Sequence, residues 1–255
     1  MTAHSTSRVA LITGGSRGLG RATALRIAAD GIDPIITYRT HPDEADAVAE
    51  EVRSMGRNAA AFRLDVADIH SLAAFADTVR KVLADVWGRE DFDFLVNNAG
   101  IGSGTAFADV TEEEFDALMN VHLKGVFFLT QSLLPLVRDG GRIVNVSTAL
   151  TRYYYPGSTA YAMMKGGQET LTRYLAAELG PRRISVNTVA PGATATDFAG
   201  GVMRTPQLRE ALGGRTAMGR MGEPEDIAGV IAALLGPDIG WVTGQRLEAS
   251  GGIAL

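Results

Sequence analysis

The chain has 255 residues, of which 46% are hydrophobic, and its formal net charge is −5. Charges of both signs are interspersed, which argues against a nucleic-acid-binding stripe or a basic membrane-surface helix. The absence of cysteine excludes disulfides, thiolate catalysis and cysteine-ligated metal sites. The scattered histidines predict no metal site; they are His4, His41, His70 and His122.

Residues 1–8 are polar and lack the apolar segment of a signal peptide. No run approaches the ~18 apolar residues that a transmembrane helix needs. A chain without cysteine also suits a reducing compartment. We therefore expect a cytoplasmic protein with no membrane partner.

Apolar strands and helical segments alternate along the chain. Strands are predicted at 8–13, 34–38, 59–64, 93–97, 141–147, 184–189 and 245–249. Helices are predicted at 21–30, 42–55, 69–86, from 111 toward 135, at 158–179 and at 224–235. Thr111 and Glu114 have the spacing of a capping box. This alternation predicts an α/β fold, with a parallel seven-stranded sheet, helices on both faces and a single domain over 1–255.

The segment 193–222 is rich in glycine and threonine and has weak periodicity. Segments of this kind close over active sites and carry specificity. We expect a substrate lid within 193–222, with Gly200-Gly201 and Gly213-Gly214 as hinges.

A glycine loop follows the first predicted strand. Gly14, Gly18 and Gly20 let the backbone approach a phosphate closely, and the next helix offers free N–H groups to it. The loop, with Ser16, Arg17 and Leu19, therefore predicts a dinucleotide-binding site. The alternative is an ordinary glycine-rich turn.

The end of the second predicted strand bears on cofactor choice. A site for NAD usually has a carboxylate there, which accepts a hydrogen bond from the ribose 2′-hydroxyl. In this chain no carboxylate follows the strand before Asp43. Arg39 and Arg17 offer guanidinium groups, which match a 2′-phosphate. We expect NADP(H); the alternative is that both arginines are simply exposed.

Tyr161 and Lys165 lie one helical turn apart. An ammonium beside a phenol lowers the tyrosine pKa and makes it a tunable acid/base. Taken alone, a tyrosine and a lysine at this spacing are also common on solvent-exposed helix faces, which is the alternative interpretation.

These motifs occur in a recognisable order. They are Thr13–Gly20, Leu64-Asp65-Val66, Asn97-Asn-Ala-Gly100, Asn120-Val121, Ile143–Ser147, Tyr161-x3-Lys165 and Pro191-Gly-x3-Thr196. From Val9 to Gly252 the chain resembles the short-chain dehydrogenase/reductases, and most of all the members similar to 3-oxoacyl-carrier-protein reductases. The resemblance implies a doubly wound Rossmann domain.

The resemblance also implies residue roles. Asp65 and Val66 are expected at the adenine, while Asn97, Asn98, Ala99 and Gly100 are expected to line the cofactor and to steady the fourth strand. Thr194 and Thr196, after the Pro191-Gly192 turn, are expected to hold the nicotinamide carboxamide, and Lys165 the nicotinamide ribose beside Tyr161. Asn120 is expected to support a water that links Lys165 to solvent.

One position departs from the family pattern. The family usually has a serine thirteen residues before the tyrosine, and this chain has Thr148 there. A threonine hydroxyl has the same hydrogen-bonding capacity. We expect Thr148 to orient the substrate carbonyl and keep Ser147 as the alternative.

The predicted activity is NADPH-dependent reduction of a carbonyl to an alcohol (EC 1.1.1.-), with Tyr161 as general acid. The substrate is a small-molecule ketone or an acyl thioester, and Tyr153-Tyr154-Tyr155 form either its wall or a subunit interface. A homotetramer, or a dimer, is expected. Two alternatives are an NADP-dependent alcohol dehydrogenase and a non-catalytic NADP(H)-sensing regulator.

Overall fold

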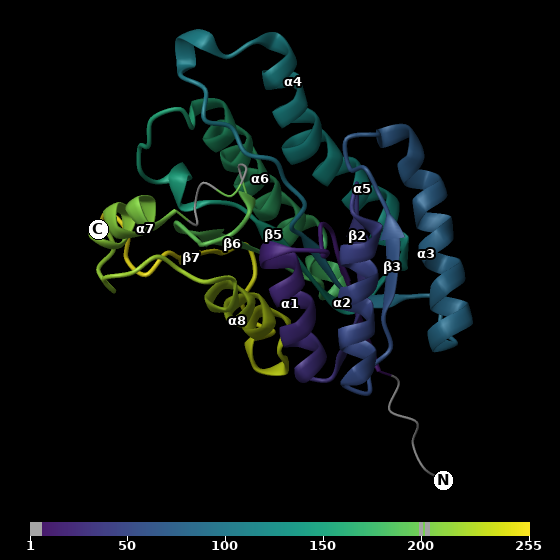
Figure 1. The fold of residues 1–255 in the computed structure, drawn as a ribbon. Helices are drawn as coiled ribbons and strands as arrows, with labels where there is room; N and C mark the ends of the chain where they lie inside the picture. Colours follow the sequence, from purple (N-terminus) through teal and green to yellow (C-terminus); the bar gives the residue numbers. More distant parts are fainter. Residues whose placement is uncertain (1–6, 199–200, 202–204) are drawn as a thin grey trace.

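Seven parallel strands form the central sheet of the computed structural model, which describes residues 7–198, 201 and 205–255 (Figure 1). Their order is β3-β2-β1-β4-β5-β6-β7. The strands are β1 (Arg8–Ile12), β2 (Ile32–Tyr38), β3 (Ala60–Arg63), β4 (Phe92–Asn97), β5 (Val137–Val146), β6 (Ser185–Pro191) and β7 (Arg246–Ala249). The predicted parallel α/β fold is confirmed. The strand order reverses between β1 and β4, where sheets of this kind bind ligands at the carboxyl ends of their strands.

Helices cover both faces of the sheet (Figure 1). One layer contains α1 (Gly18–Ala29), α2 (Pro42–Ser54) and α8 (Pro224–Leu235); the other contains α3 (Leu72–Trp87), α5 (Val126–Leu133) and α6 (Thr159–Glu178). Val9 and Leu11 of β1 join the core under α3, α5 and α6, whereas Ala10 and Ile12 join the opposite core. Burial on both faces explains why such strands are almost continuously apolar.

The helix predicted from residue 111 is divided. The structure has α4 (Glu112–Met119), a π-helical turn (Asn120–Gly125) and then α5. Thr111 Oγ1 accepts the backbone N–H of Glu114 at 3.2 Å, as expected. The Glu114 carboxylate accepts the Ser103 hydroxyl at 2.7 Å, so it ties the loop after β4 to the start of α4.

The predicted lid contains a helix that its weak periodicity did not indicate. This is α7 (Pro206–Gly213), which has only two turns and begins at a proline. Of the expected hinges, Gly201, Gly213 and Gly214 are described and Gly200 lies outside the described residues. Short 3₁₀ turns occupy Ile69–Ser71, Phe107–Asp109, Leu134–Leu136, Ala149–Thr151, Gly180–Arg182 and Pro237–Ile239.

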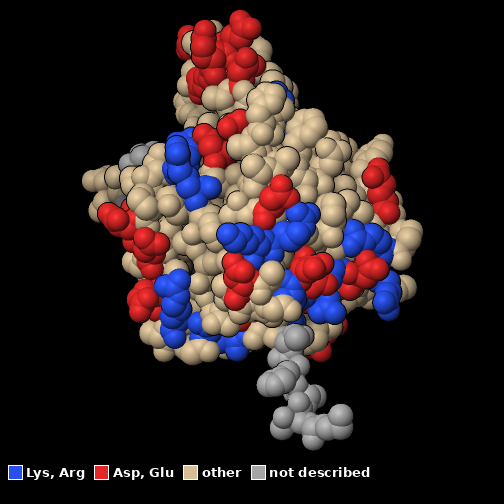
Figure 2. Space-filling model, turned by 90° about the vertical axis from the view of Figure 1, so that its right-hand side faces the viewer, with Lys and Arg blue, Asp and Glu red and all other residues tan. Residues whose placement is uncertain are grey.

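Surface charge is mixed on the face drawn in Figure 2, except at the projecting tip, where acidic side chains gather. The first turn of α4 contributes Glu112, Glu113 and Glu114. Within the described ranges, no helix is long and apolar enough to span a membrane. The same ranges contain no cluster of histidine, aspartate and glutamate suited to a metal ion.

Candidate active site

A cleft of about 930 Å³ lies at the carboxyl ends of the strands. Loops that follow β1, β2, β3, β4, β5 and β6 all contribute to its lining, as expected for a doubly wound sheet. Most of the predicted site residues line it: Gly14, Ser16, Arg17, Gly18, Leu19, Arg39, Asp65, Val66, Ala99, Gly100, Thr148, Tyr161, Lys165, Pro191, Gly192, Thr194 and Thr196.

Asn97 and Gly20 are not part of the cleft lining. Asn97 is 2% exposed and donates to Thr130 Oγ1 and Asn145 Oδ1, so it joins β4 to α5 and β5. A Cβ on Gly20 would lie 2.1 Å from the carbonyl oxygen of Gly14, so this glycine permits the loop to fold back on α1. Both residues shape the site from behind it.

The glycine loop is braced by Asn98, the second residue of the Asn97–Gly100 motif. Asn98 lines the cleft and donates from Nδ2 to the carbonyl oxygens of Thr13 and Gly14 at 2.8 and 3.0 Å. The loop turns at Gly14 and Gly18, which have φ values of 66° and 54°. Because few residues other than glycine adopt such angles, these two positions require it.

Two exposed arginines line the same cleft at the end of β2 and the start of α1. They are Arg39 and Arg17. Among the described lining residues, the carboxylates are Asp65 and Asp197, and neither belongs to β2. One Asp65 oxygen accepts the backbone N–H of Ala67 at 3.0 Å. This end of the cleft therefore presents two guanidinium groups, whose geometry matches a phosphate.

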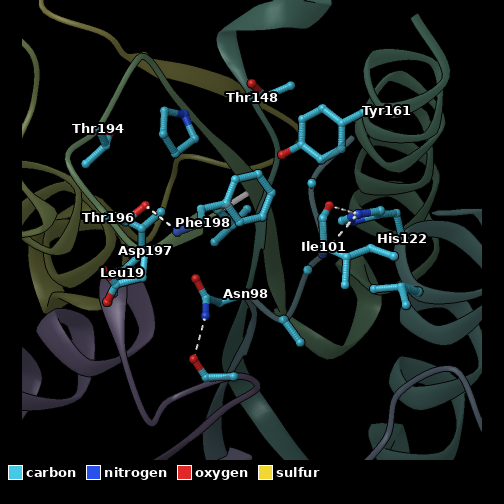
Figure 3. Close-up of a pocket in the computed structure, with 18 of the residues that line it drawn as sticks. Leu19, Asn98, Ile101, His122, Thr148, Tyr161, Thr194, Thr196, Asp197 and Phe198 are labelled. Carbon is cyan, nitrogen blue, oxygen red and sulfur yellow. Dashed lines mark hydrogen bonds between the residues drawn. The ribbon is translucent and has the colours of Figure 1, made fainter. Parts of the chain in front are cut away.

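Tyr161 points its hydroxyl into the cleft, with Thr148 beside it (Figure 3). Burial raises the pKa of Tyr161 above its ordinary value, and a hydrogen bond with the Thr148 side chain opposes that rise. The expected net lowering of this pKa beside Lys165 is therefore wrong for this structure. Desolvation of the phenolate is the larger effect.

Lys165 is 3% exposed, and its ammonium lies 5.9 Å from the centre of the Tyr161 ring. Nζ donates to the carbonyl oxygen of Val146 at 2.6 Å and to Gln168 Oε1 at 3.3 Å. Burial lowers the pKa of Lys165 to about 7, and the charge of Glu169 opposes that shift. Lys165 therefore changes charge near neutral pH.

The two candidate hydroxyls at the end of β5 face different partners. Ser147 Oγ donates to Glu169 Oε1 at 2.7 Å. Thr148 instead lies beside Tyr161, and its hydroxyl accepts the Leu150 N–H at 3.3 Å. The hydroxyl next to the tyrosine is that of Thr148.

A charged network holds the segment that carries these hydroxyls. Glu169 also accepts from Thr151 and Arg246 at 2.9 Å each. Arg246, on β7, donates in addition to the carbonyl oxygen of Thr148 at 3.3 Å. The last strand of the sheet thus fixes the backbone beside the catalytic candidates.

Asn120 is not among the cleft-lining residues of the described chain, although its neighbours Val121 and His122 are. The π-helical turn that begins at Asn120 presents these two residues to the cleft. The expected role of Asn120 stays a prediction, and His122 was not among the predicted site residues. Its place between two apolar residues, Val121 and Leu123, was the available signal.

The tyrosine run after β5 is divided between cleft and surface. Tyr153 and Tyr155 line the cleft, whereas Tyr154 is 78% exposed. Phe198 also lines the cleft, with its ring centre 5.9 Å from that of Tyr161. Aromatic rings therefore wall the open part of the cleft.

A model of the family described as Enoyl-(Acyl carrier protein) reductase matches residues 14–254. The chain belongs to the short-chain dehydrogenase/reductase family. It is therefore a member of a family of oxidoreductases, as the order of its motifs predicts.

Relatives in this family support the assignment along the whole chain. An uncharacterized oxidoreductase of Methylorubrum extorquens is 37% identical over 248 residues, which cover 96% of this chain and 97% of the relative. A 3-oxoacyl-[acyl-carrier-protein] reductase of Synechocystis sp. is 35% identical over 253 residues, or 98% of each chain. Among solved structures, the angucycline C-6 ketoreductase LanV with bound NADP has a TM-score of 0.92 and 38% identity, covering 97% of this chain and 95% of LanV.

Proposed function

We propose that this short-chain dehydrogenase/reductase is an NADPH-dependent ketoreductase in which Tyr161 is the proton donor. The observation that carries the proposal is the pairing of the Tyr161 and Thr148 hydroxyls in the wall of the nucleotide-sized cleft, with Lys165 buried behind them. An assay of NADPH consumption with a panel of ketones, aldehydes and 3-oxoacyl thioesters tests it. No consumption with any carbonyl would contradict it.

The cleft fits a dinucleotide in both shape and charge. Gly14 and Gly18 open a cradle at the start of α1 for the pyrophosphate, and Arg17 and Arg39 match a 2′-phosphate. We assign Asp65 and Val66 to the adenine, and Thr194 and Thr196 to the nicotinamide end. When bound, NADPH supplies the hydride that the substrate carbonyl carbon accepts.

Cofactor preference has a direct test. Arg39→Ala removes one of the two cations at this end of the cleft, so the ratio of kcat/KM for NADPH over NADH is expected to fall ~10-fold or more. A charge-assisted contact to a phosphate is worth about that factor. Steady-state kinetics with both cofactors provide the measurement.

The exposed Arg80 of α3 is the matched control, and Arg80→Ala is expected to leave the ratio unchanged. A wild-type protein that prefers NADH would refute the cofactor assignment. An unchanged ratio in Arg39→Ala would remove Arg39 from it.

In the proposed reaction the protein supplies a proton and a hydrogen bond to the carbonyl oxygen of the substrate. Tyr161 gives its hydroxyl proton to the carbonyl oxygen as negative charge develops there. Thr148 donates a hydrogen bond to the same oxygen and so orients it. The Lys165 ammonium stabilises the phenolate that remains, and the proton returns from solvent through Lys165.

The choice between two adjacent hydroxyls gives a second test. Thr148→Ala is expected to lower kcat ~10²-fold, the scale of one lost oxyanion donor. Ser147→Ala removes a hydroxyl that faces Glu169 and is expected to cost less than ~10-fold. Thr148→Ser retains the hydroxyl and restores most of the rate. The opposite ranking, with Ser147→Ala the more damaging change, would refute the assignment.

The protonation state of Tyr161 favours the reductive direction. A raised pKa keeps the phenol protonated near neutral pH, which is the form that a proton donor needs. An alcohol dehydrogenase working oxidatively would need the phenolate instead. A non-catalytic NADP(H)-sensing regulator has no need of the Tyr161, Thr148 and Lys165 arrangement.

The walls of the cleft favour a free ketone with an aromatic or apolar body. Tyr153, Tyr155 and Phe198 supply rings for stacking, and the angucycline ketoreductase similarity is in keeping with this. The acidic tip at α4 adjoins the Ser103 loop that lines the mouth and would repel an acidic carrier protein. Two arginines of the predicted lid, Arg204 and Arg209, are the cations there that could bind an acidic carrier or a phosphopantetheine group. Arg209 is paired with Glu223, and Arg204 lies outside the described residues.

The assembly and the lid remain predictions. α5 and α6 expose apolar side chains, Phe127, Phe128, Met163 and Tyr174, which fit packing against a second subunit. We propose a homotetramer or a dimer, and light scattering distinguishes them. The lid within 193–222 and the cytoplasmic location are likewise proposals.

A further inference from the structure

One buried histidine lies against the proposed proton donor. The imidazole of His122, in the π-helical turn, is 0% exposed and meets the ring of Tyr161 edge-on. The ring centres are 5.2 Å apart and the ring planes are 82° apart. Edge-to-face contacts of this kind are directional, so they restrict the orientation of both rings. The proposed mechanism does not yet use this residue.

The hydrogen bonds of His122 define its tautomer. Nε2 lies 2.8 Å from the carbonyl oxygen of Ile101 and 3.4 Å from its backbone nitrogen (Figure 3). We assign the proton to Nε2, because the contact with the carbonyl oxygen is the shorter of the two. Nδ1 then carries a lone pair, and it has no hydrogen-bond partner among the described residues. A phenylalanine would make the same ring contact without burying that nitrogen. The bond to Ile101 is therefore what histidine adds at this position.

The charge state of His122 excludes it as the proton donor. Burial, together with the charge of Lys165, lowers the pKa of His122 to about 3. The imidazole is neutral near pH 7, and its single N–H is occupied by the Ile101 carbonyl. His122 therefore acts on the reaction through the groups that it holds.

The bond to Ile101 reaches the wall of the cleft. Ile101 lines the cleft, and the loop around it continues to Ser103 and Gly104. The imidazole fits behind this loop because residue 100 is glycine: a Cβ there would lie 2.9 Å from His122 Cε1. One side chain thus contacts the proton donor on one side and the substrate wall on the other.

We propose that His122 is a positioning residue with two separable effects. Its ring holds the Tyr161 phenol in the orientation for proton donation, and its Nε2–H holds the Ile101 loop against the substrate. The proposal rests on the assignment of Tyr161 as proton donor.

Two substitutions separate these effects. His122→Gln keeps an N–H donor near the position of Nε2 but removes the ring, so kcat is expected to fall about tenfold with ketone KM almost unchanged. His122→Phe keeps the ring but removes the donor, so ketone KM is expected to rise about tenfold with kcat within about threefold. NADPH affinity is expected to stay at the wild-type value in both.

A double-mutant cycle distinguishes positioning from general loosening of the fold. In a Tyr161→Phe background the oriented hydroxyl is absent, so adding His122→Gln is expected to cause no further loss of kcat. An equal loss in both backgrounds would overturn the proposal, and so would wild-type kcat in His122→Gln alone. This cycle decides the matter even where His122→Phe fails to fold.

The matched control is His70→Gln, the same change at an exposed histidine outside the cleft lining. It is expected to have wild-type kcat and KM. Full turnover in Tyr161→Phe alone would instead refute the proposed function, so the two failures have different signatures.

Discussion

Tyr161→Phe is expected to lower kcat by ~10²-fold or more, because it removes the proton donor and retains the ring. The dissociation constant for NADPH should change little, since the cofactor contacts proposed for the glycine loop, Arg17 and Arg39 remain. The melting temperature should also stay close to that of the wild type, because one hydrogen bond with Thr148 contributes only ~1 kcal/mol. NADPH consumption, cofactor fluorescence titration and thermal unfolding provide the three measurements.

The chain offers a matched control in Tyr154, seven residues earlier and 78% exposed. Tyr154→Phe removes the same hydroxyl from a neighbouring ring outside the cleft and is expected to leave kcat unchanged. Retention of more than about a third of the wild-type kcat in Tyr161→Phe would contradict its role as general acid.

Lys165→Met is expected to lower kcat by ~10²-fold or more and to weaken NADPH binding about tenfold. The change removes the ammonium that stabilises the Tyr161 phenolate and the proposed donor to the cofactor ribose. The exposed Lys81→Met on α3 is the control and is expected to match the wild type. Wild-type turnover in Lys165→Met would contradict the mechanism.

The dependence of kcat on pH also tests the role of Lys165. With a lowered pKa of about 7, Lys165 is charged below that pH and loses its charge as pH rises through it. The reductive kcat is therefore expected to decline on the alkaline side of about pH 7, and Lys165→Met should lack that decline. Glu169 raises the pKa of Lys165, so Glu169→Gln is expected to move the decline to lower pH. A shift in the opposite direction would show that the decline belongs to another group.

The predicted site residues that line the cleft lie in short segments at the ends of strands. Gly14, Gly18, Asp65 and Thr196 each follow a recognisable apolar strand, and the topology of a parallel sheet brings those ends together. A local motif therefore defines both the residue and its place in the fold. No long-range information was needed for these positions.

Two expectations were incorrect, those for Asn97 and for the pKa of Tyr161. The first depends on which way a single strand residue faces, and the second depends on how deeply the side chain is buried. Side chains alternate along a strand, and Asn97 ends β4 facing the core, whereas Asn98 is the neighbour that reaches the cleft. The spacing of Tyr161 and Lys165 showed that they were neighbours, but it held no information on desolvation. That desolvation, set by the surrounding fold, determines the direction of the Tyr161 pKa shift.

The π-helical turn at Asn120–Gly125 has a consequence for changes in chain length. Such a turn holds more residues per turn than an α-helix does, commonly because one extra residue has been accommodated. Deleting one residue there would let the segment rewind as an α-helix, with α4 and α5 facing nearly as before, but the side chains within the turn would change direction. The position of His122 beside Tyr161 thus depends on how many residues the turn contains as well as on which residues they are. A library that varies loop lengths in this protein should leave this turn at its present length.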